Sequence, residues 1–161
     1  MSRRWAFLVN DLAASPYVSM RMRVAVLRRL GIETETDQIY PRCYFHTCNV
    51  WLGRGAILNH GVHIENVERV EIGPLTGLGV FTVVLTSTHE LGSHRCRFGE
   101  WQRKPVTIGA GCWIGARSLI LPGVTIGDGC LIAAGSVVSE DCQPDGLYGG
   151  TPARRIKDLP T

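Results

Sequence analysis

Aliphatic residues recur at every sixth position through the second half of the chain, from Val106 to Cys142. The rungs of this ladder are Ile108, Ile114, Ile120, Ile126, Ile132 and Val138. Four residues after each rung stands a small side chain, two positions before the next aliphatic, so both point to one face of a short strand. Glycine and proline stand between the strands, where they favour turns. Strands of about three residues separated by turns predict a chain that coils into a prism with its aliphatics inside.

The six-residue step continues upstream in two shorter pieces, separated by two extra residues near Val67–Val70. Their aliphatic rungs are Leu52, Leu58 and Ile64, then Ile72, Leu78 and Val84. The small positions of the second piece are Thr76, Thr82 and Thr88, and a less regular first coil is expected around Ile39 and Cys43. A β-sandwich is the alternative, but its turns would fall roughly every 8–12 residues. We therefore predict a mainly β fold, a parallel β-helix built from six-residue repeats.

Residues 16–30 depart from the ladder and carry apolar positions at helical spacing. The segment begins at a proline, and Gly31 follows it, as is typical after the C-terminus of a helix. We expect a cap helix over the open N-terminal end of the coil. Its arginines are expected to form a solvated face: Arg21, Arg23, Arg28 and Arg29.

Residues 90–105, ELGSHRCRFGEWQRKP, interrupt the ladder a second time. The segment is polar, contains Trp101 and directly follows His89. A long loop on a rigid repeat scaffold commonly carries function. We predict a single domain over 1–161, divided into a helical cap at 1–36, coils with this loop at 37–142, and a tail at 143–161.

Length and composition bound the class of protein. A chain of 161 residues is long enough for one domain with a buried core and short for two. Hydrophobic residues make up 45% of it and charged residues 19%, as in a folded globular protein. The net charge of +3 is too small to indicate a nucleic-acid partner, and it fits a cationic pocket for a polyanionic small ligand equally well.

Targeting signals are weak in this sequence. No apolar run approaches the length of a membrane span. The apolar patch near the N-terminus is interrupted by Asn10 and Asp11, which disfavours a signal peptide. None of the six cysteines forms a Cys-x-x-Cys pair, and four occupy small buried positions of the coil: Cys43, Cys112, Cys130 and Cys142. We therefore expect a cytoplasmic protein without disulfides.

Six short motifs follow one another in a specific order. They are TSTHE at 86–90, KPVTIG at 104–109, CWIGA at 112–116, ILPGVTIGDG at 120–129, IAAGSVVSED at 132–141 and GGTPARRIK at 149–157. The chain thereby resembles the hexapeptide-repeat acyltransferases, especially the galactoside, maltose and polysaccharide O-acetyltransferase branch. The resemblance covers roughly residues 39–157. It implies a left-handed parallel β-helix, a homotrimer with active sites between subunits, and acetyl-CoA as acyl donor, with no metal.

The resemblance also implies roles for two residues near the acceptor. His89 falls at the position of the family's catalytic histidine, and histidine is the ordinary general base near neutral pH. Asn59 falls at the position of an asparagine that contacts the acceptor in the sugar acetyltransferases. The alternative interpretations are a surface histidine at a coil corner and a turn-forming asparagine.

Coenzyme A would lie in a groove beside the last coils. Trp113 is expected to be exposed there because Cys112 and Ile114 point inward, and it walls either the groove or a subunit contact. The other predicted cofactor-binding residues are Ala116, Ala133, Ala134, Ser139, Arg154 and Lys157. Arg154 and Lys157 match basic phosphate-binding positions of the family, although a solvated basic tail is the simpler alternative.

One departure from the family concerns the cofactor phosphates. The family often has Thr-Lys where this chain has Ser139-Glu140, so the usual contact to the 3′-phosphate is in doubt, and Arg155 is a candidate to compensate. The loop is expected to shape the acceptor site through Arg95, Arg97 and Trp101, since an aromatic face suits a sugar ring.

Three other functions remain open from the sequence. His89 and His94 have the His-x4-His spacing of the γ-class carbonic anhydrases, with His60 or His63 as a third zinc ligand. A catalytically silent scaffold would use the same fold. An amino group of a sugar could replace the hydroxyl as acceptor, and because an amine attacks with little help, His89 would then matter less.

Overall fold

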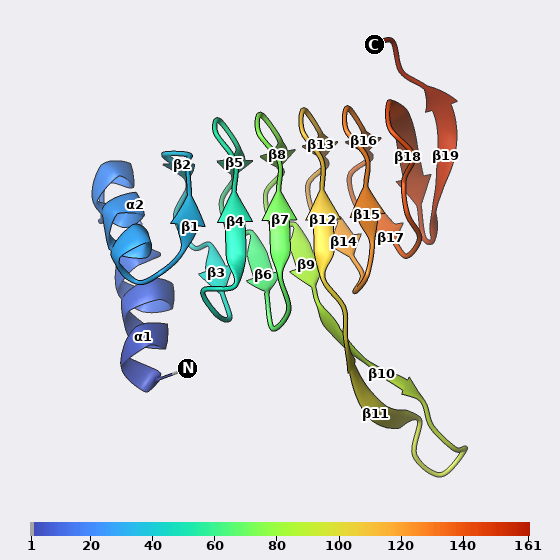
Figure 1. Ribbon diagram of the computed structural model, residues 1–161, viewed down its shortest axis with the longest axis horizontal. Coiled ribbons are helices and arrows are strands. Elements are labelled where there is room, and N and C mark those ends of the chain that lie inside the picture. Colours follow the sequence, from blue (N-terminus) through green and yellow to red (C-terminus); the bar gives the residue numbers. More distant parts are fainter. Residues whose placement is uncertain (1) are drawn as a thin grey trace.

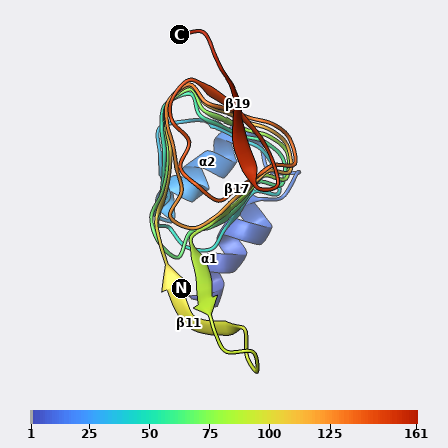
Figure 2. The ribbon, with the colours of Figure 1, turned by 90° about the vertical axis from the view of Figure 1, so that its right-hand side faces the viewer.

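The strands of the computed structural model, which describes residues 2–161, wind into a three-sided prism (Figure 1, Figure 2). Each face is named here for its first strand. The β1 face holds β1 (Glu33–Thr34), β4 (Val50–Leu52), β7 (Val70–Ile72), β12 (Val106–Ile108) and β15 (Thr125–Ile126). The β2 face begins with β2 (Gln38–Ile39), β5 (Ile57–Leu58), β8 (Gly77–Leu78), β13 (Trp113–Ile114) and β16 (Leu131–Ile132). The β3 face holds β3 (Tyr44–Phe45), β6 (His63–Glu65), β9 (Val83–Leu85), β14 (Leu119–Ile120) and β17 (Val137–Val138).

The predicted aliphatic rungs form the core of the prism. Each of the twelve rungs is at most 1% exposed. Parallel pairing stacks equivalent residues from coil to coil, so Ile114 lies between Leu78 and Ile132. Burying one such side chain stabilises the fold by about 1.5–3 kcal/mol. The mainly β coil predicted from the six-residue step is confirmed.

The small positions between the rungs also connect successive coils. The Thr76 hydroxyl donates to the carbonyl oxygen of Gly109 at 2.5 Å, and the Cys112 thiol donates to that of Gly127 at 3.1 Å. All four cysteines expected at small positions are buried. A small polar side chain here both fits the corner and satisfies a carbonyl that the coil leaves unpaired.

The N-terminal end of the prism is covered by helices, as expected, but their bounds differ from the prediction. α1 (Arg3–Phe7) runs into a π-helix, η1 (Leu8–Ala13), and α2 is Met20–Arg29. The predicted helix over residues 16–30 therefore begins later, because Ser19 caps α2 and its hydroxyl accepts the N–H of Met22. No helix within residues 2–161 combines the length and the apolar character needed to span a bilayer.

The prediction that the arginines of α2 form a solvated face is wrong for Arg23, which is 2% exposed. Its guanidinium donates at 2.8–3.0 Å to carbonyl oxygens from both sides of the cap–coil junction: those of Ala13, Ser15, Val18 and Ile39. A guanidinium can be buried where its donors are all satisfied. The helical period alone did not distinguish this inward arginine from its neighbours.

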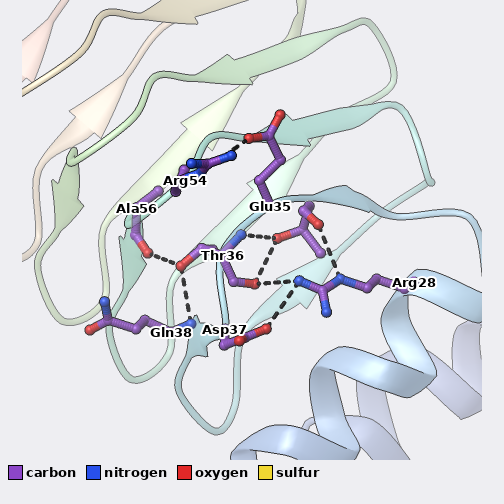
Figure 3. Close-up of polar contacts among 8 residues, drawn as sticks. Arg28, Glu35, Thr36, Asp37, Gln38, Arg54 and Ala56 are labelled. Atoms are coloured by element: carbon purple, nitrogen blue, oxygen red, sulfur yellow. Dashed lines mark hydrogen bonds and ion pairs between the residues drawn. The ribbon is translucent and has the colours of Figure 1, made fainter.

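A polar cluster joins α2 to the first coil (Figure 3). Arg28 of α2 forms an ion pair with Asp37 at 3.0 Å, and its Nε donates to the carbonyl oxygen of Thr34. The buried hydroxyl of Thr36 donates to the carbonyl oxygen of Ala56 in the second coil at 2.6 Å. These bonds fix the cap on the prism, and the coil begins at β1, ahead of the predicted boundary at residue 37.

The segment predicted as a loop over residues 90–105 is largely a β-hairpin. β10 (Ser87–Leu91) pairs antiparallel with β11 (Phe98–Arg103), and the hairpin projects from the prism between β9 and β12 (Figure 1). Thr88 lies on this hairpin and is exposed, so its expected place at a small core position is wrong.

The predicted tail over residues 143–161 continues the β2 face. β18 (Gly146–Gly150) pairs in parallel with β16, and β19 (Ala153–Asp158) pairs antiparallel with β18. The GGTPARRIK motif therefore lies on the hairpin that closes the C-terminal end of the prism (Figure 1).

Candidate active site

A groove of about 500 Å³ lies on the β2 face. It is lined by Gly79, Val80, Gly115, Leu131, Ile132 and five residues predicted for the site: Asn59, Trp113, Ala116, Ala133 and Ala134. The lining is mostly apolar, with small residues at the coil corners that keep the surface open. Such an open, narrow surface can accept an extended, largely apolar arm.

Trp113 forms a wall of this groove. Its neighbours Cys112 and Ile114 point into the core, so the indole points outward and is 65% exposed, as predicted. Trp113 pairs with Gly77 of the preceding coil, and both residues line a second hollow of about 260 Å³. The ring thus stands between two hollows on the same face, because Gly77 has no side chain to fill the space beside it.

Asn59 contributes to the groove and also to its own turn. Its Oδ1 accepts the backbone N–H of His60 at 2.8 Å, the local bond expected of a turn-forming asparagine. The side chain also lines both hollows on the β2 face. Both interpretations of Asn59 from the sequence are therefore compatible with its position.

His89 lies on β10, exposed, with its ring fixed by its own hairpin. Its Nδ1 is 3.0 Å from the carbonyl oxygen of Gly99. Because a carbonyl oxygen can only accept, Nδ1 must carry the proton, and in the neutral ring Nε2 is left as a free acceptor. A histidine held in this tautomer is suited to accept a proton from an incoming group.

Aromatic side chains surround His89 on the same face of the hairpin. Trp101, predicted for the acceptor site, pairs directly with His89 across the strands. The Phe98 ring contacts His89 edge-on at 5.9 Å between centroids, and the Arg103 guanidinium lies 5.0 Å from the centre of the Trp101 ring. The sequence analysis missed Phe98 and Arg103, and strand alternation across a hairpin would have found them.

Arg95 and Arg97 lie in the connection between β10 and β11, and both are exposed. One guanidinium nitrogen of Arg97 is 3.4 Å from the carbonyl oxygen of Gly92. Of the three predicted acceptor residues, the hairpin pairing brings only Trp101 opposite His89.

The predicted phosphate-binding residues lie at the C-terminal end. Arg154 forms an exposed ion pair with Glu140 at 3.1 Å, so the glutamate that departs from the family pattern contacts this arginine directly. Lys157 and Ser139 are exposed. Arg155, the candidate to compensate, pairs with Asp158 and donates to carbonyl oxygens of residues 143–145, which occupies its guanidinium in the fold of the tail.

Within one chain, the two parts of the predicted site, the groove and His89, lie apart. The groove lies on the β2 face, whereas His89 stands on the hairpin that leaves the prism where the β3 face meets the β1 face. His89 does not line the groove. Figure 1 shows β13 and β16 at the top of the prism and the hairpin below it.

The histidines considered as zinc ligands form no metal site among the described residues of a single chain. Within residues 2–161, no group of three or more His, Cys, Asp or Glu side chains has a geometry that could hold a metal ion. His94 lies in the connection of the hairpin, and His63 stacks on Tyr44 at 4.3 Å between ring centroids. Burial lowers the pKa of His63, and the nearby Glu65 carboxylate partly opposes this effect.

Comparison with known proteins identifies the class of this fold. Residues 105–140 match the family model described as bacterial transferase hexapeptide (six repeats). The chain superposes on a maltose O-acetyltransferase from Clostridium difficile 630 with a TM-score of 0.81, at 30% identity, covering 99% of this chain and 84% of that one. The prism is a left-handed parallel β-helix of hexapeptide repeats, as the resemblance implied.

Two further relatives extend the comparison. A hexapeptide-repeat acetyltransferase from Vibrio cholerae, complexed with acetyl coenzyme A, has a TM-score of 0.78 at 30% identity and covers 98% of this chain and 85% of its own. The galactoside O-acetyltransferase of Escherichia coli K12 is 32% identical over 126 residues, 78% of this chain and 62% of that enzyme. The chain belongs to the hexapeptide-repeat acetyltransferase family.

Proposed function

We propose that this protein is an O-acetyltransferase that moves the acetyl group of acetyl-CoA to a hydroxyl of a sugar or glycosylated acceptor. The observation that carries the proposal is the bond from His89 Nδ1 to the Gly99 carbonyl, which leaves Nε2 free to act as general base. The galactoside and maltose O-acetyltransferases among the relatives support the sugar acceptor, and the acetyl coenzyme A complex of the Vibrio protein supports the donor.

In this reaction His89 Nε2 accepts the proton of the acceptor hydroxyl while the hydroxyl oxygen attacks the thioester carbonyl carbon. The C–S bond then breaks, and the imidazolium returns the proton to the leaving thiolate. The Gly99 carbonyl holds the ring in one tautomer and stabilises the positive charge that forms during the step. Trp101 and Phe98 provide apolar surface on which a sugar ring can stack beside Nε2.

The groove on the β2 face is proposed to hold the pantetheine arm of the donor. Trp113 forms its wall, and the alanines at 116, 133 and 134 leave room along the coil corners. Arg154 and Lys157 would reach the phosphates as charge-assisted donors, and Ser139 directly precedes Glu140, the ion-pair partner of Arg154. Glu140 opposes phosphate binding, because it holds Arg154 and adds a negative charge.

We propose a homotrimer in which the hairpin of one copy lies beside the groove of the next. The separation of His89 from the groove in one chain supports a shared site. A half-buried aliphatic patch on the β3 face, beside the outward Tyr44, His63 and Glu65, also supports assembly: Val83, Leu85, Leu119 and Val137. The outward residues of the β1 face are mostly polar: Glu33, Trp51, Glu71, Thr107 and Thr125.

The test is turnover of acetyl-CoA against a panel of sugars and amino sugars by the protein and by H89A. For a hydroxyl acceptor we expect H89A to lose at least about two orders of magnitude in kcat, the usual contribution of a general base. Binding of coenzyme A to H89A, measured by calorimetry, should be retained, because His89 does not line the groove.

H94A is the matched control, since His94 is an exposed histidine on the same hairpin. It should turn over acetyl-CoA like the unchanged protein. Near-normal O-acetylation by H89A would refute the base. Efficient transfer to amino sugars alone, insensitive to H89A, would favour N-acetylation, and stoichiometric zinc lost in both H89A and H94A would favour the carbonic anhydrase alternative.

A further inference from the structure

Glu65, at the end of β6, holds the root of the hairpin that carries His89. Its Oε2 accepts the backbone N–H groups of Thr86 and Ser87 at 2.9 and 3.1 Å. Its Oε1 accepts the Ser87 hydroxyl at 2.8 Å. One carboxylate thus receives three hydrogen bonds from two consecutive residues, at the point where the chain leaves the prism and only two residues before His89.

Glu65 lies on a paired strand of the prism, so its contacts tie the hairpin to the coil. β6 lies within the rigid β3 face, where Glu65 pairs with Leu85 and points outward, half-buried. The Thr86 hydroxyl donates back to the Glu65 carbonyl oxygen at 2.6 Å. Hydrogen bonds to an ionised acceptor are stronger than neutral ones, so the carboxylate anchors β10 more firmly than the backbone ladder could alone.

The ring of His89 is fixed to its own hairpin, not to the prism. Its Nδ1 partner, Gly99, and its ring neighbour, Phe98, both belong to β11. His89 therefore moves with the hairpin as one unit, and its place relative to the prism depends on the angle at which β10 leaves. The bonds of Glu65 to Thr86 and Ser87 lie at this exit on the β10 side, and an ion pair between Arg103 and Glu68 at 3.7 Å lies on the β11 side.

We infer that Glu65 is a positioning residue for His89: its carboxylate fixes the exit angle of the hairpin and so the position of Nε2 over the bound acceptor. The inference rests on the proposed role of His89 as base. Glu65 itself exchanges no proton in the reaction. A displacement of about 1 Å at a reacting group can cost on the order of 100-fold in rate, so a loose root would be visible in kcat.

The test compares E65A with E65Q in the full-length protein. E65A removes both carboxylate oxygens and with them all three hydrogen bonds, so the Ser87 N–H loses its partner and the Thr86 N–H keeps only the backbone carbonyl oxygen of residue 65 at 3.2 Å. We expect its kcat to fall by about 10- to 100-fold, with little change in the KM for acetyl-CoA, because Glu65 does not line the groove. In E65Q the amide oxygen can accept both N–H groups and the amide nitrogen can donate to the Ser87 hydroxyl, so its kcat should stay within about threefold of the unchanged protein.

E71A is the matched control. Glu71 is also an outward glutamate of a short strand, but it pairs with Arg69 on the β1 face and makes no bond to the hairpin. Its kcat should be unchanged. Thermal unfolding of all three variants shows whether they fold, and a folded E65A with normal kcat would overturn the inference.

The outcomes separate this inference from the proposed function. If H89A is inactive while folded E65A is normal, His89 stands as the base and Glu65 has no positioning role. If H89A is normal, the proposed function itself fails. If E65Q is as poor as E65A, restoring the hydrogen bonds at residue 65 does not restore the position of His89, and the inference that Glu65 acts through these bonds is overturned. If E65A does not fold, S87A removes one bond of the three, and an unchanged kcat in S87A together with a poor E65Q would overturn the inference.

Discussion

At the scale of single residues, the chemistry depends on which partner each ionisable group has. His89 gives one nitrogen to the Gly99 carbonyl and keeps the other free, and its proposed role as base depends on this hydrogen bond. Arg154 is already engaged by Glu140, whereas Arg155 is bound by the chain around it. These pairings determine which side chains are available to a ligand.

Removing Glu140 should strengthen donor binding. In E140A, Arg154 no longer has its carboxylate partner and one negative charge near the phosphates is lost. We expect the Kd for coenzyme A to fall by roughly two- to fivefold, because an exposed ion pair contributes up to about 1 kcal/mol. Calorimetry at low salt measures the change. R154A should raise the Kd, and an unchanged Kd in both variants would place the phosphates elsewhere.

At the scale of the elements, the coil is a stack in which several of the small polar positions donate to the next coil. The stacking keeps thiols away from water, and this burial raises the pKa of Cys43 and of Cys142 to about 12 and that of Cys112 to about 11. The ordinary value is 9.0. The folded protein therefore keeps these thiols neutral at a pH where the unfolded chain ionises them.

Stability should consequently fall in alkali. Between pH 9.0 and about 11 only the unfolded chain loses these three protons, and for Cys43 and Cys142 this range extends to about 12. The free energy of unfolding is therefore at its full value below this range and decreases as the pH rises through it. Urea denaturation at about pH 8 and about pH 10.5 measures the effect. C142A should lose less stability between the two pH values than the unchanged protein, and an equal loss would show that other groups cause it.

The elements differ in how well the sequence predicts them. The aliphatic rungs were predictable because the six-residue period of the sequence matches the stacking of residues in the core. Ile114, for example, lies between Leu78 and Ile132. The hairpin at residues 87–103 was not predictable, because its two strands pair with each other away from the core and show no apolar period. The burial of Arg23 was missed because its partners are backbone carbonyl oxygens before α2 and on β2, which the helical period does not reveal.

At the scale of the whole molecule, the groove and His89, the two parts of the proposed site, lie on different sides of the prism. The sequence identified residues of the groove and the hairpin, and Asn59, Trp113 and the three alanines do line one surface. Their distance from His89 could not be read from the sequence, because it depends on which corner of the coil each motif occupies. The proposed site between copies would join both parts.

Assembly should depend on the β3 face. Leu119 is a half-buried outward residue of β14, in the middle of the aliphatic patch. L119E should yield monomers in light-scattering measurements and lose acetyl transfer, because a charge cannot be buried there without a partner. T125E, on the exposed β1 face, is the control and should remain assembled. An assembled and active L119E would exclude this face as the interface.

The central claim is that a groove from one copy and His89 from the next form one acetyltransferase site, and mixing two inactive variants tests it. A134W fills the groove from an exposed corner and leaves His89 intact, whereas H89A leaves the groove intact. Co-expressed, they should recover roughly a quarter of normal acetyl transfer, since half of the grooves and half of the neighbouring histidines are intact. Mixed assemblies, verified with two affinity tags, that show no activity above the separate variants would contradict the claim.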